Sequence, residues 1–212
     1  MKKLLFLLLL VSSSVFAQKV EHGVLGGAGI GFAMNDKFPF TMERHDAYQN
    51  DPTANLNFGY RFRFLPAQKL FFDLDMKVVL QWFQYYVDNI SLPEDWENAK
   101  PGELVVPAGK SHTDFLVPLS VAASCNYHIT DRFHIGLGVS PTLYVNPGTT
   151  FDLPVLAKIG YRLGRHCELG LSYQYGCLNV LKHLNRKDGY GFGRYGHMSD
   201  LMVSVYIPLF SK

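Results

Sequence analysis

Residues 57–64 of this chain read Asn-Phe-Gly-Tyr-Arg-Phe-Arg-Phe, so aromatic residues alternate strictly with polar or small ones. A period of two is that of a β-strand, whose successive side chains point to opposite faces. Residues 70–82 continue the pattern, because apolar side chains hold every even position while Asp73, Asp75, Lys77 and Gln81 lie on the other face. The second stretch predicts a strand long enough to cross a lipid bilayer.

The same alternation predicts eight strands and an up-and-down β-barrel. We expect strands at residues 23–34, 53–64, 70–86, 113–128, 133–145, 151–163, 167–175 and 201–209. Four joins (35–52, 87–112, 146–150 and 177–200) alternate with joins of only a few residues. All four lie at one end of the barrel, where 35–52, 87–112 and 177–200 form three long loops, and both termini lie at the other end. This arrangement is typical of outer-membrane β-barrels.

The first residues have the pattern of a secretory signal peptide. Lys2 and Lys3 precede an apolar run, and a small residue at Ala17 ends the segment. Because residue 18 is Gln rather than Cys, a lipoprotein anchor is not indicated. The sequence therefore predicts a cleaved signal peptide at 1–17 and a single outer-membrane barrel domain at 18–212, exported to the bacterial cell outer membrane.

The composition excludes several classes of protein. Removal of Lys2 and Lys3 lowers the 20 basic residues to 18, which equals the 18 acidic ones, so no basic surplus is available for nucleic acid. Charged residues make up 18% of the chain, below the roughly 25% of soluble domains, and aromatic residues make up 14%. The three cysteines lack metal-ligand spacing, so we expect neither a metal site nor a cofactor.

The two faces of the predicted sheet differ in side-chain size. Ten glycines lie on the polar face and one on the apolar face, which carries the bulky aromatic residues. An eight-stranded barrel has room inside only for side chains that fill it, so the face with small residues should point inward. We therefore expect an apolar exterior in lipid. The alternative is a secreted soluble barrel of lipocalin type, with its apolar face inside.

An inward polar face would carry balanced charges. The expected interior set comprises Arg61, Arg63, Lys77, Lys158 and Arg162 with Asp73, Asp75, Asp114, Asp152 and Glu168. Unpaired charges are very costly in a dry interior, so these residues predict a network of ion pairs that plugs the barrel. A proton or ion relay through the network is the functional alternative.

Three stretches are similar to the outer-membrane β-barrel domain family of Bacteroidota, often labelled PorT-like. They are residues 113–119 (TDFLVPL), 135–141 (IGLGVSP) and 169–179 (LGLSYQYGCLN). The resemblance spans nearly the whole mature chain and implies location and fold. One branch of this family is associated with secretion of adhesins and proteases, and the resemblance implies no catalytic residues.

The C-terminus departs from the usual pattern of barrels that the assembly machinery inserts, which end on an outward-facing aromatic residue. The outward phase here runs through Val203, Val205, Ile207 and Leu209, so Phe210 is out of phase. A β-bulge at Pro208 would restore the phase. We expect the barrel-assembly machinery to be a partner during insertion.

An enzyme is the second hypothesis, because His197 and Ser199 share a strand face and resemble the His-x-Ser of lipid A deacylases. No acidic residue follows Asp200, which points to the opposite face, so the acid that would orient the histidine is missing. We therefore expect a non-catalytic protein with a structural, adhesive or secretion-associated role.

The last long loop combines cationic and aromatic residues among glycines. The candidate contact residues are Arg186, Lys187, Tyr190, Phe192, Arg194 and Tyr195. Arginine pairs with phosphate, and aromatic faces stack on sugars, so this loop could contact lipopolysaccharide or a protein partner. An ordinary interfacial girdle beside a solvated loop would have the same composition.

Overall fold

The computed structural model describes residues 19–34, 48–50, 53–87, 110–146, 148–164, 166–180 and 197–211, and of residues 33–34, 48–50, 83–87, 110–114 and 211 it describes the backbone only. These residues form the strands β1 (Val20–Met34), β2 (Tyr48–Asn50), β3 (Thr53–Phe64), β4 (Leu70–Val87), β5 (Lys110–Leu116), β6 (Pro118–His128), β7 (Phe133–Val139), β8 (Thr142–Tyr144), β9 (Thr150–Asp152), β10 (Val155–Arg162), β11 (Glu168–Tyr175) and β12 (His197–Ser211). Within the described ranges, no helix has the length and apolar character needed to cross a membrane.

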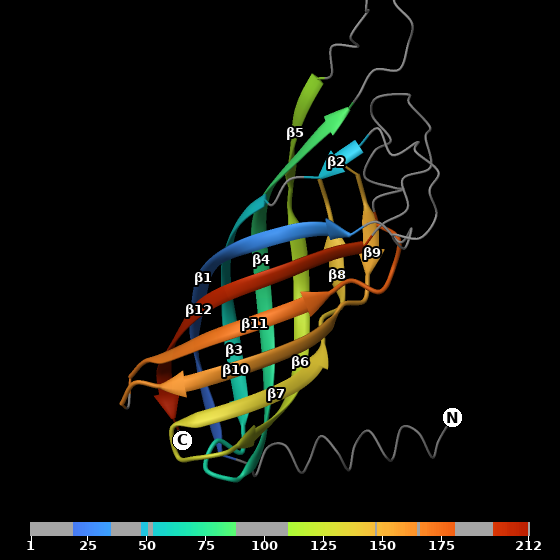
Figure 1. Cartoon of the computed structure of the whole chain (residues 1–212). Coiled ribbons are helices and arrows are strands. Elements are labelled where there is room, and N and C mark those ends of the chain that lie inside the picture. The colour runs from blue at the N-terminus through green and yellow to red at the C-terminus, as the bar shows by residue number, and fades with distance from the viewer. Residues whose placement is uncertain are drawn as a thin grey trace, which may run out of the picture.

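The strands close into one antiparallel barrel (Figure 1). Going round the wall, β1 pairs with β3, then β4, β6, β7, β10, β11 and β12 follow, and β12 returns to β1. β5, β8 and β9 continue β6, β7 and β10 along the wall. The twelve strands therefore occupy eight positions around the wall, as in an eight-stranded barrel. The predicted fold class is confirmed.

Three of the predicted continuous strands are interrupted. The breaks fall at Val117, at Ser140–Pro141 and at Leu153–Pro154. Proline has no amide hydrogen, so Pro141 and Pro154 cannot donate to a neighbouring strand. Their carbonyl groups still accept, from the amides of Val121 at 3.0 Å and Ser140 at 2.8 Å. The wall consequently continues across the breaks although the ladder is irregular there.

The two ends of the barrel differ. The turns at 65–69, 129–132 and 163–167 lie at one end, called here the short-turn end, together with the start of β1 and the end of β12. At the opposite end, called the loop end, β2 and β5 both pair with the last residues of β4, and β4 and β5 rise above the rest of the wall (Figure 1). The sequence did not predict β2, and β12 begins four residues earlier than expected.

Side chains on the barrel wall are mostly apolar outside and mostly polar inside. Phe58 on β3, Leu137 on β7 and Val203 on β12 are 58%, 68% and 57% exposed, whereas Arg63 and Asp73 are buried. A soluble barrel of lipocalin type would show the reverse arrangement, so that alternative is wrong. An exposed apolar surface of this extent around a closed barrel matches the exterior of a transmembrane barrel.

The small residues inside make room for large ones. Gly160 on β10 pairs with His134 on β7, and a Cβ atom at Gly160 would fall on the imidazole ring of His134. His134 is itself buried. Glycine at this position therefore allows an imidazole to occupy the lumen between two strands.

The C-terminal strand contains the bulge that would bring Phe210 into the outward phase. His22 pairs with Phe210 and Gly23 with Pro208, so Leu209 is the extra residue in β12. Leu209 and Phe210 are in consequence both exposed on the outside of the barrel. Phe210 lies against the ring of His22, with 5.3 Å between the ring centroids.

Candidate functional site in the barrel interior

The register of β3 and β4 places basic residues directly opposite acidic ones. Arg61 pairs with Asp75, and Arg63 with Asp73, across the antiparallel ladder. Arg61 donates to both carboxylate oxygens of Asp75 at 2.7 and 2.9 Å, and Arg63 to those of Asp73 at 2.8 and 3.1 Å. Both pairs are bidentate, which is the strongest geometry between a guanidinium and a carboxylate.

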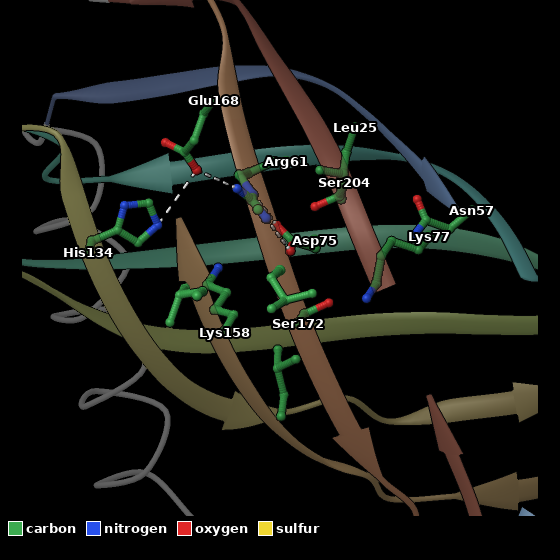
Figure 2. Close-up of a pocket in the computed structure, with 14 residues that line it drawn as sticks. Leu25, Asn57, Arg61, Asp75, Lys77, His134, Lys158, Glu168, Ser172 and Ser204 are labelled. Atoms are coloured by element: carbon green, nitrogen blue, oxygen red, sulfur yellow. Dashed lines mark hydrogen bonds and ion pairs between the residues drawn. The ribbon is translucent and has the colours of Figure 1, made fainter. Parts of the chain in front are cut away.

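Glu168, the first residue of β11, joins these pairs from across the lumen (Figure 2). Its carboxylate accepts from Nη1 of Arg61 at 3.0 Å and from Nη1 of Arg63 at 2.6 Å. Lys158 on β10 donates to Asp73 at 2.6 Å. The network therefore connects four strands inside the barrel near the short-turn end.

Two residues of the network were missed by the sequence reasoning. Glu21 accepts from Arg162 and lies 3.8 Å from Nη1 of Arg63, and His134 Nε2 lies 3.6 Å from Glu168. Glu21 fell outside the predicted first strand, which began at residue 23. It lies two residues before Gly23, so extending the same alternation toward the N-terminus would have placed it on the inward face.

Aromatic rings cover the buried guanidinium groups. Arg61 and Arg63 lie 5.0 and 5.4 Å from the centroid of the Tyr206 ring, and Arg63 lies 4.6 Å from that of Phe71. A desolvated cation over a ring face gains further electrostatic stabilisation. The two arginines are thus enclosed by carboxylates and rings.

Other predicted members of the interior set lie elsewhere. Lys77 is buried in the lumen but forms no ion pair or hydrogen bond with another described residue. Asp152, toward the loop end, accepts through Oδ1 from the backbone amides of Leu153 and Leu178 at 2.7 and 2.9 Å. The side chain of Asp114 lies outside the described residues. So do all six candidate contact residues of the last loop, Arg186, Lys187, Tyr190, Phe192, Arg194 and Tyr195.

Toward the loop end the lumen changes from charged to mixed polar and apolar. Asp200 points inward and accepts from the amide group of Asn55 at 2.6 Å. Beyond it lie four buried apolar side chains from β5, β8, β12 and the segment after β11: Leu116, Tyr144, Met198 and Val180. These side chains form an apolar layer inside the barrel between Asp200 and the loop end.

His197, Ser199 and Asp200 do not form a nucleophilic site in this arrangement. His197 and Ser199 both lie in β12 in phase with the outward Leu201, and Ser199 is only 1% exposed. The imidazole of His197 lies 3.1 Å from the carbonyl oxygen of Leu178 and stacks on Tyr175. Asp200 points into the lumen, as expected. The described residues contain no group of three or more His, Cys, Asp or Glu side chains that could hold a metal ion.

Comparison with known proteins names no family for this chain. No protein-family model matches it, and neither does any curated protein sequence. Among solved structures, it is similar to Ail, the attachment invasion locus protein of Yersinia pestis, in complex with sucrose octasulfate (11% identity, 91% of this chain and 99% of that one, TM-score 0.41). It is also similar to OprG of Pseudomonas aeruginosa (11%, 90% and 92%, TM-score 0.44) and to Neisserial surface protein A (12%, 89% and 96%, TM-score 0.36).

Proposed function

We propose that this chain is a non-catalytic protein of the bacterial outer membrane, with a structural, adhesive or secretion-associated role. The observation that carries the proposal is the combination of an exposed apolar exterior with a filled interior. The exterior needs a lipid environment, and buried ion pairs occupy the lumen near the short-turn end. Such a protein acts through the parts that leave the membrane.

The sequence pattern of the first residues agrees with the same location. We propose that residues 1–17 are a cleaved signal peptide and that 18–212 form the mature barrel. The outward position of Phe210 at the end of β12 suits recognition by a barrel-assembly machinery. The sequence resemblance to the PorT-like family of Bacteroidota agrees with this location and with a link to secretion.

The loop end is the proposed contact surface. The last long loop contains the basic and aromatic candidates Arg186, Lys187, Tyr190, Phe192, Arg194 and Tyr195. We propose that it contacts the anionic head groups of lipopolysaccharide or a protein partner, since guanidinium groups bind phosphate in bidentate fashion. Hydrolysis of lipid A at His197 and Ser199 is less well supported, because the serine is buried and Asp200 faces away from it.

Two measurements test the proposal. The first is mobility on a denaturing gel, with and without boiling, of protein extracted by detergent from outer membranes. We expect a heat-dependent shift. Recovery in the aqueous fraction without a shift would contradict membrane insertion.

The second is conductance of the purified barrel in a planar lipid bilayer. We expect no sustained channel openings. A stable open conductance would contradict an interior occupied by ion pairs.

A further inference from the structure

A groove crosses the outer face of the wall over β6, β7, β10 and β11. Its volume is about 680 Å³, within the roughly 300–1,000 Å³ of pockets that hold small ligands. It extends from Leu70, the first residue of β4, to Leu201 on β12. Asn126 and Lys158 border it although both are buried on the lumen side, so the main chain of the wall forms part of its floor. The groove is therefore a hollow in the surface that faces lipid.

Two rows of outward side chains form the groove, because pairing between neighbouring strands aligns them. In one row Ala157 on β10 pairs with Leu137 on β7 and with Tyr173 on β11. The next row toward the short-turn end contains Ile159 and Ile135, which pair with each other. Leu137 is 68% exposed and projects from the wall. The methyl group of Ala157, between two large neighbours, consequently leaves the hollow.

The shape and the lining of the groove suit a single hydrocarbon chain. Leu137, Ile159 and Tyr173 present apolar surface to it. An empty hollow would leave these side chains without dispersion contacts on one side, so an occupant is favoured. A second barrel is convex and would rest on the projecting Leu137 without reaching the floor beside Ala157. A flexible acyl chain follows such a groove closely.

Basic side chains lie where the groove opens toward the short-turn end. The carbonyl oxygen of Lys69 accepts from the amide of His128 at 2.8 Å, which places the turn before β4 beside the turn before β7. Lys69 and Arg132 in these two turns are both exposed, and Asp131 is the acidic residue there. Basic residues at a membrane interface attract anionic head groups. The net positive charge of the two turns thus complements a lipid phosphate.

We propose that the groove binds one acyl chain of an anionic phospholipid, whose phosphate group contacts Arg132 and Lys69. A guanidinium group binds phosphate in bidentate fashion. The short-turn end of an outer-membrane barrel faces the periplasm, so the lipid comes from the inner leaflet. The inference rests on the outer-membrane location proposed above. It gives the wall one side that retains a lipid, whereas lipids around the rest of the wall exchange freely.

The first test uses the barrel refolded in phosphatidylcholine vesicles that contain a small fraction of phosphatidylglycerol with a photoreactive diazirine in one acyl chain. Irradiation attaches this chain to the residues that it contacts, and mass spectrometry of peptides locates them. We expect labelling on β6, β7 and β10 to exceed labelling on β1, on the opposite side of the wall. Labelling spread evenly around the wall would overturn the proposal.

A matched pair of variants tests the hollow itself. Ala157→Leu fills it and should lose most of the labelling on β7 and β10. Ala28→Leu adds the same atoms to an exposed position on the outer face of β1 and should keep the wild-type labelling. Undiminished labelling in Ala157→Leu would overturn the proposal.

The contact with the head group has a test of its own. Competition against unlabelled phosphatidylglycerol and against unlabelled phosphatidylcholine measures the preference for the anionic lipid. We expect Arg132→Gln to lower this preference about five-fold, the typical effect of one basic residue near a membrane surface. Lys19→Gln removes an exposed lysine at the same end, beside β3, and should leave the preference unchanged. An unchanged preference in Arg132→Gln would contradict the proposed contact.

The heat-dependent gel shift separates failure of this inference from failure of the proposed location. A shifted barrel without preferential labelling would overturn the groove as a lipid site and leave the membrane location intact. A wild type without the shift would overturn both. A bifunctional thiol reagent that joined two barrels through Cys125, which lines the groove, would identify an interface between copies and overturn the lipid site.

Discussion

Glu168 accepts hydrogen bonds from Arg63 across the lumen at 2.6 and 2.8 Å, although the two residues are 105 positions apart in the sequence. The same carboxylate accepts from Arg61. One acidic side chain on β11 thus connects two basic side chains on β3 through the centre of the barrel, so the opposite walls are joined by an ion pair as well as by the ladder around the circumference.

Neutralising Glu168 should therefore be costly. In Glu168→Gln, two buried guanidinium groups lose their shared counter-charge, and loss of one partner of a buried pair costs about 3–5 kcal/mol. We expect a decrease of this order in the free energy of unfolding, measured by urea titration of the refolded barrel in lipid vesicles. Asp131→Asn, in an exposed turn, is the matched control and should change it little. Equal midpoints for both variants would show that the pair contributes nothing.

Arg61 and Asp75 should behave as a coupled pair. Asp75 forms its ion pair with Arg61, so replacing both together removes two charges without leaving Asp75 unpaired. We expect Arg61→Met with Asp75→Leu to cost less than the sum of the single changes, with a coupling free energy of roughly 1–3 kcal/mol. A double-mutant cycle in urea measures it, and strict additivity would contradict direct pairing.

Gly160→Ala should destabilise the barrel because its methyl group would displace the buried imidazole of His134. Overpacking of this kind typically costs about 1–3 kcal/mol. Gly26→Ala is the control, since the nearest atom to its new Cβ would be a backbone oxygen at 3.9 Å, an ordinary contact. The comparison is made by urea titration, and a Gly160→Ala variant as stable as Gly26→Ala would mean that His134 moves freely.

Phe210→Ala should impair insertion in cells more than it impairs the stability of the refolded barrel. The residue is 65% exposed on the outer wall, so its removal leaves no buried cavity. We expect a reduced amount of the heat-shifted band in outer membranes, whereas Phe151→Ala, which removes another exposed aromatic ring, should leave that amount close to wild type. Equal reductions in both variants would argue against a specific role of the C-terminal aromatic residue.

The alternation of residues such as those at 57–64 was sufficient to predict the eight strand positions around the barrel wall and their two faces, because the period of a strand is a local property. The breaks beside Pro141 and Pro154 were missed, since a single proline is compatible with an irregular strand that still accepts hydrogen bonds. The short strand β2 was missed because it pairs with an extension of β4 that only the assembled wall provides.

The sequence could not predict which charged residues contact one another across the interior of the barrel. Adjacent pairs such as Arg63 with Asp73 follow from the register of a hairpin, but the contact of Arg63 with Glu168 depends on the curvature and stagger of the entire barrel. For the same reason, a count of charges could not distinguish Lys158, which pairs with Asp73, from Lys77, which forms no salt bridge with another described residue.

Glu21 on β1 pairs with Ser211 on β12, so the two ends of the barrel wall are neighbours in space. The order of the strands along the chain can therefore be changed without a change in their order around the wall. Linking these two neighbouring ends and opening the chain in the turn at 129–132 would give a circular permutant with the same neighbours for every strand. Phe210 would then lie within the chain rather than at its end. Such a permutant would separate the residues that determine the fold of the barrel from the proposed recognition of its C-terminal residues during insertion.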